Sequence, residues 1–204
     1  MRELGSKWGA PERSTRSVVM RRAAAGGSAI LAGGALLALP ATGGSAPSRS
    51  LDKRIFGFAL QVEYLQAAFY TAAVEGGALR GEVLEFAETV ADHERQHVEF
   101  FRRTLGSAAG AEPQFDFGRR TASKRAFLDA ALRLENSGVA AYNGQAANLT
   151  KKSLSAIASI VSVEGRHAAW VNAIAGRQPA PRAADPGATA KVVAKRLERL
   201  GFVG

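Results

Sequence analysis

The sequence predicts an all-α protein, a four-helix bundle with one long crossover between its second and third helices. Two observations predict this class. Apolar residues recur at helical spacing in four long segments. In addition, one pattern of glutamate and histidine occurs in both halves of the chain, at matching places in these segments. At 204 residues and 47% hydrophobic content, the chain can form one domain with a full core.

The four helices are expected over residues 51–75, 81–105, 123–145 and 153–175. Gly76-Gly77 and Gly106 end the first two, because glycine is a poor helix former that readily adopts left-handed conformations. The glycine-rich stretch 106–120 reads as a loop. A helix of 25 residues is about 37 Å long, and fifteen extended residues reach about 50 Å. This loop can therefore return along the whole bundle, so that helices two and three run parallel.

Both ends of the chain differ from the bundle. Residues 1–46 are expected to be an export signal: Arg21-Arg22 precede a weakly apolar stretch and small residues, which resembles a twin-arginine signal. A general secretory signal or an uncleaved anchor are the alternatives, and Met20 is a second possible start. The bundle domain is assigned to residues 47–177. Residues 178–204 are expected to form a Pro-rich linker and a short basic helix, docked through Val192, Val193, Leu197 and Leu200.

The amino-acid composition limits which metals and partners the protein can bind. There is no cysteine, so any metal must be held by oxygen and nitrogen ligands, which favours iron or manganese over a structural zinc. The net charge is +9, but the basic residues are scattered and are not interleaved with aromatic residues. We therefore expect a solvated basic surface and no nucleic-acid partner.

The repeated pattern is a single glutamate followed, about thirty residues later, by Glu-x-x-His. The first half has Glu63, Glu94 and His97, and the second half has Glu135, Glu164 and His167. Positions i and i+3 share one face of a helix, so each Glu-x-x-His can direct a carboxylate and an imidazole to one point. Four helices carrying these residues present the ligand set of a dinuclear metal site with carboxylate ligands.

The four glutamates lie in apolar stripes, with no Lys or Arg one turn away on the same face. Burial of an unpaired carboxylate costs several kcal/mol, and four together would also repel one another. Two divalent cations cancel the four negative charges, so we expect two metal ions; the alternative is a polar network made by the protein alone. Each Glu-x-x-His would anchor one ion, and Glu63 and Glu135 could either bridge the ions or bind one each.

Three further residues are candidates for contacts with the ligands. Tyr70 and Tyr142 follow Glu63 and Glu135 by seven residues each. Their hydroxyls could bind a ligand carboxylate or act in redox chemistry, or they could be ordinary tyrosines at the edge of the core. Gln66, one turn after Glu63, faces the site or its rim.

A rival reading starts from the run His93-Glu94-Arg95-Gln96-His97, which matches the zinc-protease motif H-E-x-x-H. In that reading His93 and His97 bind zinc and Glu94 is the general base. It leaves the second Glu-x-x-His unexplained and offers no clear third ligand. We expect His93 to lie beside the site or at the helix surface.

Five blocks of the sequence together resemble the bacterial exported ferritin-like domain proteins, which are related to plant desiccation-related proteins. The blocks are Glu63-Tyr64-Leu65 through Ala67-Ala68-Phe69-Tyr70, His93 through Phe100, Leu134-Glu135-Asn136, Val139 through Tyr142 and Val163 through Ala169. The resemblance covers roughly residues 51–175. It implies a ferritin-like four-helix bundle and a di-iron or iron–manganese centre held by the two glutamate–histidine sets. Such proteins often have a second acid where this chain has Gln66.

Two functions follow as expectations, and no catalytic residue is assigned in either. The first is an exported dinuclear metalloprotein that reacts with oxygen, peroxide or Fe(II) in stress protection or iron handling. The second is a non-catalytic stress or envelope protein in which the metal stabilises the bundle. In both, the protein is a passenger of the twin-arginine translocation machinery and ends in the periplasm, the cell envelope or outside the cell. The oligomeric state is left open.

Overall fold

The computed structural model describes residues 46–202, and nearly all of the predicted export signal falls on residues 1–45, outside the described part. Between residues 46 and 202 the regular elements are all helices, with no strand, which confirms the all-α prediction. The helices are α3 (Arg49–Glu75), α4 (Glu82–Leu105), α5 (Lys124–Gln145), α6 (Lys151–Ile174) and α7 (Ala190–Glu198), with short 3-10 turns at Gly106–Ala108 and Ala146–Asn148. None of these helices combines the length and the apolar character that a membrane crossing requires.

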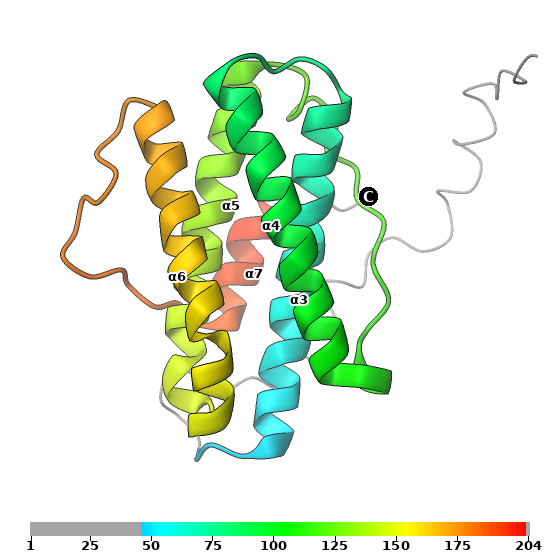
Figure 1. Cartoon of the computed structure of the whole chain (residues 1–204), viewed down its shortest axis with the longest axis vertical. Coiled ribbons are helices and arrows are strands. Elements are labelled where there is room, and N and C mark those ends of the chain that lie inside the picture. Colours follow the sequence, from blue (N-terminus) through cyan, green and yellow to red (C-terminus); the bar gives the residue numbers. More distant parts are fainter. Residues whose placement is uncertain (1–45, 203–204) are drawn as a thin grey trace, which may run out of the picture.

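The connectivity is that of two helix pairs joined by a crossover. α3 packs along α4, and α5 packs along α6. Figure 1 shows the segment after α4 running back along the outside of the bundle, so that α4 and α5 point in the same direction. The hydroxyl of Tyr64 on α3 donates to the carbonyl of Gly110 at 3.2 Å, which holds the crossover against the bundle.

The helix boundaries differ from the expected ones by one or two residues, and the caps explain the larger differences. The side chain of Ser48 accepts a hydrogen bond from the Leu51 amide at 3.2 Å, so α3 begins two residues earlier than expected. Thr150 caps α6 in the same way through the Ser153 amide. A hydroxyl side chain satisfies one of the free amides of a first helical turn, so the helix starts directly after it.

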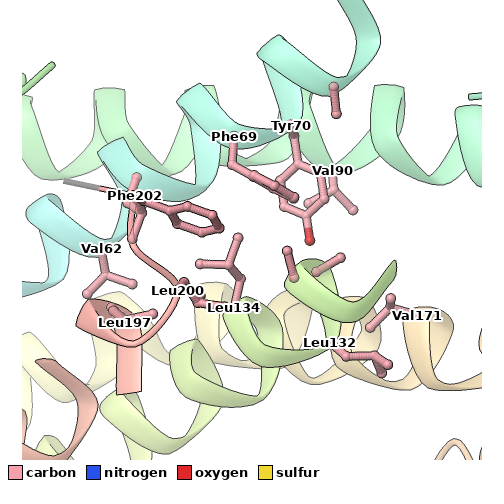
Figure 2. Close-up of a cluster of buried hydrophobic side chains, with 14 of the residues drawn as sticks. Val62, Phe69, Tyr70, Val90, Leu132, Leu134, Val171, Leu197, Leu200 and Phe202 are labelled. Atoms are coloured by element: carbon pink, nitrogen blue, oxygen red, sulfur yellow. The ribbon is translucent and has the colours of Figure 1, made fainter. Parts of the chain in front are cut away.

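The short helix α7 docks on the bundle, but not through every residue expected. Val193, Leu197 and Leu200 are buried, whereas Val192 is 43% exposed, so the prediction for Val192 was wrong. At 100° per residue Val192 lies outside the stripe that faces α5. Figure 2 shows Leu197, Leu200 and Phe202 in the same apolar cluster as side chains from α3 and α5.

Asp52, in the first turn of α3, binds the start of α6. Its Oδ1 accepts the Thr150 amide at 2.9 Å, and its Oδ2 accepts the hydroxyls of Thr150 and Ser153 at 2.6 and 2.7 Å. Burial raises the pKa of Asp52, but these hydrogen bonds outweigh burial and leave the pKa below its usual value. The carboxylate therefore joins the two halves of the bundle at this end.

Asp52→Asn is expected to lower the free energy of unfolding by about 1–3 kcal/mol at pH 7, because hydrogen bonds to a charged acceptor are lost. Since the folded-state pKa is lowered, this stabilisation is complete above the unfolded-state pKa, about 3.9. It disappears as the pH falls through the folded-state value. Denaturant unfolding of both proteins from pH 7 to pH 3 measures the difference, which should shrink below pH 4.

The control for this prediction is Asp185→Asn, which removes an exposed carboxylate from the linker before α7. It should change the free energy of unfolding by no more than about 0.5 kcal/mol. If the difference between wild type and Asp52→Asn were the same at pH 3 and pH 7, the Asp52 carboxylate would not be the stabilising group.

Candidate metal centre

The six candidate ligands come from the four bundle helices and meet in its interior. Glu63 lies on α3, Glu94 and His97 on α4, Glu135 on α5, and Glu164 and His167 on α6. All four glutamates are 0% exposed, and the two histidines are 7% and 2% exposed. The i, i+3 spacing on α4 and α6 does place each carboxylate and imidazole on one inward face.

A first group consists of Glu63, Glu94, His97 and Glu164, which each offer one ligand atom within 4.8 Å of the others. The Nδ1 atom of His97 is the common point. It lies 3.2 Å from Oε2 of Glu63, 3.2 Å from Oε2 of Glu94 and 3.2 Å from Oε1 of Glu164. Three carboxylates therefore face one imidazole nitrogen at equal distances.

A second group consists of Glu94, Glu135, Glu164 and His167, with the same 4.8 Å limit. Here Nδ1 of His167 lies 3.2 Å from Oε1 of Glu94, 3.5 Å from Oε2 of Glu135 and 3.9 Å from Oε1 of Glu164. The second group therefore repeats the composition of the first, three carboxylates and one imidazole.

Two glutamates belong to both groups. Glu94 turns Oε2 toward His97 and Oε1 toward His167, so its carboxylate lies between the groups. Glu164 is the other shared residue, whereas Glu63 and Glu135 each belong to one group. The geometry therefore assigns Glu63 and Glu135 to one ligand group each, and the two Glu-x-x-His glutamates to both groups.

Hydrogen bonds within the protein do not satisfy this cluster. A single Nδ1–H of His97 cannot donate fully to three oxygens at the same distance. Both oxygens of Glu164, Oε1 of Glu94, Oε2 of Glu135 and Nδ1 of His167 make no hydrogen bond at all. Two ligand atoms on one divalent first-row ion, each at about 2.1 Å, lie about 3.0–3.4 Å apart. The observed separations of 3.2 Å therefore fit a shared cation.

The pKa values of the cluster also indicate that its carboxylates lack compensating positive charge. Burial raises the pKa of Glu63 to about 8, and the neighbouring Glu94 charge adds to the rise. Burial and the charge of Glu63 raise the pKa of Glu164 to about 7. For His167, burial lowers the pKa, but the facing carboxylates outweigh burial and raise the pKa to about 10. Without cations the cluster holds protons, which bound metal would displace.

Two tyrosines and a glutamine hold the outer oxygens of Glu63 and Glu135. The hydroxyl of Tyr70 donates to Oε1 of Glu135 at 2.5 Å, and Nε2 of Gln66 donates to the same atom at 3.1 Å. The hydroxyl of Tyr142 donates to Oε1 of Glu63. Each tyrosine thus binds the glutamate of the other half of the chain, and Oε2 of that glutamate remains directed at the cluster.

Gly138 on α5 leaves room next to these groups. A Cβ at this position would lie 3.0 Å from Oε2 of Glu164 and 3.4 Å from Oε1 of Gln66. Both of those oxygens are buried and make no hydrogen bond. Because glycine has no side chain, Gly138 leaves the space beside Oε2 of Glu164 free, and this oxygen has no hydrogen-bond donor.

His93 lies beside the cluster, as expected, and makes a contact that sequence reasoning missed. Its Nδ1 is 2.8 Å from Nε2 of His167, and the two rings stack with centroids 5.1 Å apart. His93 belongs to neither ligand group. The zinc-protease reading requires His93 and His97 to bind one ion, and the geometry does not support it. The H-E-x-x-H spacing marked His93 as unusual, but spacing alone could not point to a partner on α6.

The bundle, its crossover and the buried carboxylate–imidazole cluster define the class: a helical-bundle protein with a candidate dinuclear metal centre. The chain belongs to the ferritin-like domain family, whose family model matches residues 51–177. This range contains α3 from Leu51 onward, all of α4, α5 and α6, and all six candidate ligands. A comparison with curated proteins found no match.

Proposed function

We propose that the protein binds two metal ions, with iron as the first choice and manganese as the alternative. Glu63, Glu94, His97 and Glu164 would hold one ion, and Glu94, Glu135, Glu164 and His167 the other. The observation that carries the proposal is the pair of overlapping groups, in which several buried ligand atoms of Glu94, Glu135, Glu164 and His167 lack hydrogen-bond partners. Four carboxylates without compensating positive charge would be a large energetic cost to the bundle.

We further propose redox chemistry with oxygen, peroxide or Fe(II), in stress protection or iron handling. Two reduced iron ions held by shared carboxylates would, when bound, supply the two electrons that a small oxidant such as peroxide accepts. The protein's part is to exclude bulk water and to orient the ligands: the tyrosine hydroxyls hold one oxygen each of Glu63 and Glu135. Burial raises the pKa of both tyrosines far above the usual value, so they stay protonated as donors.

The burial of the cluster limits the size of any substrate. All four glutamates are 0% exposed, and the two histidines are 7% and 2% exposed. Such burial suits a molecule of the size of oxygen or peroxide. It suits equally the second candidate function, a stress or envelope protein in which the metal only stabilises the bundle.

Export is part of the proposal and rests on the sequence. Arg21-Arg22 and the weakly apolar stretch that follows resemble a twin-arginine signal. That route transports folded proteins that already contain metal, which suits a buried centre. The proposed destination is the periplasm, the cell envelope or the exterior, and the relation to desiccation-related proteins rests on the sequence blocks around the ligands.

The test is consumption of oxygen or peroxide by the purified protein loaded with Fe(II). We expect consumption that is lost in Glu94→Ala and kept in Glu99→Ala, a change at an exposed residue of the same helix. If metal-loaded wild type is inert to both oxidants, the non-catalytic function stands. Metal analysis of His93→Ala completes the test: it should largely retain its metal, whereas a zinc-protease site would lose it.

A further inference from the structure

A basic groove runs over the surface formed by α5, the end of α6 and α7. It consists of two adjoining hollows of about 560 and 420 Å³, which share Asp129, Leu132 and Arg177 as lining residues. Six basic side chains and one acidic side chain line it: Lys124, Arg125, Arg133, Arg177, Arg196, Arg199 and Asp129. The groove is separate from the metal centre, which is buried inside the bundle.

The one acid in the groove is already neutralised. Oδ2 of Asp129 lies 3.4 Å from Arg120 and 3.4 Å from Arg133. The other lining cations are Lys124, Arg125, Arg177, Arg196 and Arg199, and among residues 46–202 none of them has an ion-pair partner. Exposed cations gathered in a concavity produce a positive potential that attracts anions.

The rest of the lining indicates which kind of anion fits. The remaining residues are polar or aliphatic, such as Asn136, Gln178 and Leu128, and no aromatic side chain lines either hollow. Binding of nucleic-acid bases normally uses aromatic stacking. A volume of several hundred Å³ is typical of small-molecule sites. The groove therefore suits a compact, highly charged molecule better than a nucleic acid.

We propose that this groove binds a small polyanion of phosphate chemistry, a chain of two or more phosphate groups. Guanidinium groups match phosphate oxygens with paired hydrogen bonds, and arginines from three separate parts of the chain line the groove: α5, the segment after α6, and α7 with its C-terminal cap. A phosphate chain can contact several of them at once, which a single phosphate cannot. The proposal gives α7 a role in binding, through Arg196 and Arg199, in addition to its role in the core.

The test is calorimetric titration of the full metal-loaded protein with tripolyphosphate. Arg196→Gln with Arg199→Gln should weaken binding about tenfold or more, because charge-assisted hydrogen bonds are lost. The matched control is Lys191→Gln with Lys195→Gln, which removes the same charge from exposed positions of α7 that do not line the groove. The control should weaken binding less than about twofold, as expected for screened surface charges.

Thermal unfolding of both double variants checks that they fold, as expected for exposed side chains. Absence of tripolyphosphate binding to wild type, or an equal loss in both double variants, overturns the proposal. Removal of metal by the phosphate chain would give the same heat in all three proteins, and that outcome also overturns it.

Three further ligands test whether the groove recognises a phosphate chain or negative charge in general. Adenosine triphosphate should bind about as tightly as tripolyphosphate, since the base has no aromatic partner. Citrate should bind more weakly, because it has no phosphate chain. Vesicles of anionic phospholipid should not compete with tripolyphosphate. If citrate binds equally well, or if only the vesicles bind, the groove does not recognise a phosphate chain.

Discussion

Glu164→Gln is expected to abolish binding of both metal ions, whereas Glu63→Gln is expected to remove only one. The reason is geometric: Glu164 belongs to both ligand groups, and Glu63 belongs to one. Metal analysis after reconstitution should fall from about two ions per chain to below about 0.5 in Glu164→Gln, and to about one in Glu63→Gln, if the centre is dinuclear. Equal losses in the two variants would contradict the shared position of Glu164.

In the metal-free protein, Glu164→Gln is expected to raise stability, although it abolishes metal binding. Burial raises the pKa of Glu164 to about 7. When folding raises the pKa of an acid, the contribution of that acid to stability is complete at pH values below its unfolded-state pKa. The contribution is lost as the pH rises through its folded-state pKa. At pH 8 metal-free Glu164→Gln should therefore unfold at a higher temperature than metal-free wild type. Added metal should reverse the order, since ligand binding stabilises only the wild type.

Glu99→Gln is the control for both measurements. Glu99 lies on α4 near the ligands, but it is exposed and pairs with Arg103 at 3.7 Å. It should keep the full metal content and the wild-type unfolding temperature in either state, because exposed ion pairs contribute little to stability. A loss of metal in this variant would indicate a general response of α4 to charge removal.

Gly144→Ala is expected to lower the free energy of unfolding by about 3 kcal/mol or more, at the upper end of the cost of overpacking. A Cβ at Gly144 would lie 1.8 Å from the carbonyl oxygen and 2.6 Å from the carbonyl carbon of Ala188. Both neighbours are backbone atoms, so no side-chain rotation can relieve the clash. Ala188 is also held to α5 by a hydrogen bond from its amide to the Ala140 carbonyl at 2.8 Å. Urea unfolding measures the loss.

The physical cost arises because the segment before α7 must move away from α5. That movement breaks the Ala188 hydrogen bond and exposes apolar residues of α7, such as Val193 and Leu197. Gly57→Ala is the matched control: a Cβ at Gly57 on α3 meets nothing within 4 Å. It should raise the free energy of unfolding by about 0.5–1 kcal/mol, as glycine-to-alanine changes in helices do. If Gly144→Ala lowered the free energy of unfolding only slightly, α7 would be only loosely packed against α5.

Much of the fold could be predicted because it depends on local spacing. The helical period and the glycines after α3 and α4 locate the helices, and the length of the loop between α4 and α5 predicts the crossover. The i, i+3 spacing of Glu94 and His97, inside an apolar stripe, was enough to predict that both side chains point into the bundle. A buried charge needs compensation, so the same spacing also pointed to metal. The fine boundaries were missed where a capping hydroxyl, such as Ser48, started the helix earlier.

The sequence alone determined which faces of the helices are apolar and which acids lie on them, because these properties follow from periodicity within one helix. The tertiary structure alone decided which residues meet across helices: the shared positions of Glu94 and Glu164, and the contact of His93 with His167. It also brought arginines of α5, of the segment after α6 and of the α7 region into one groove. Such contacts depend on the rotation and register of neighbouring helices, which result from side-chain packing over the whole core.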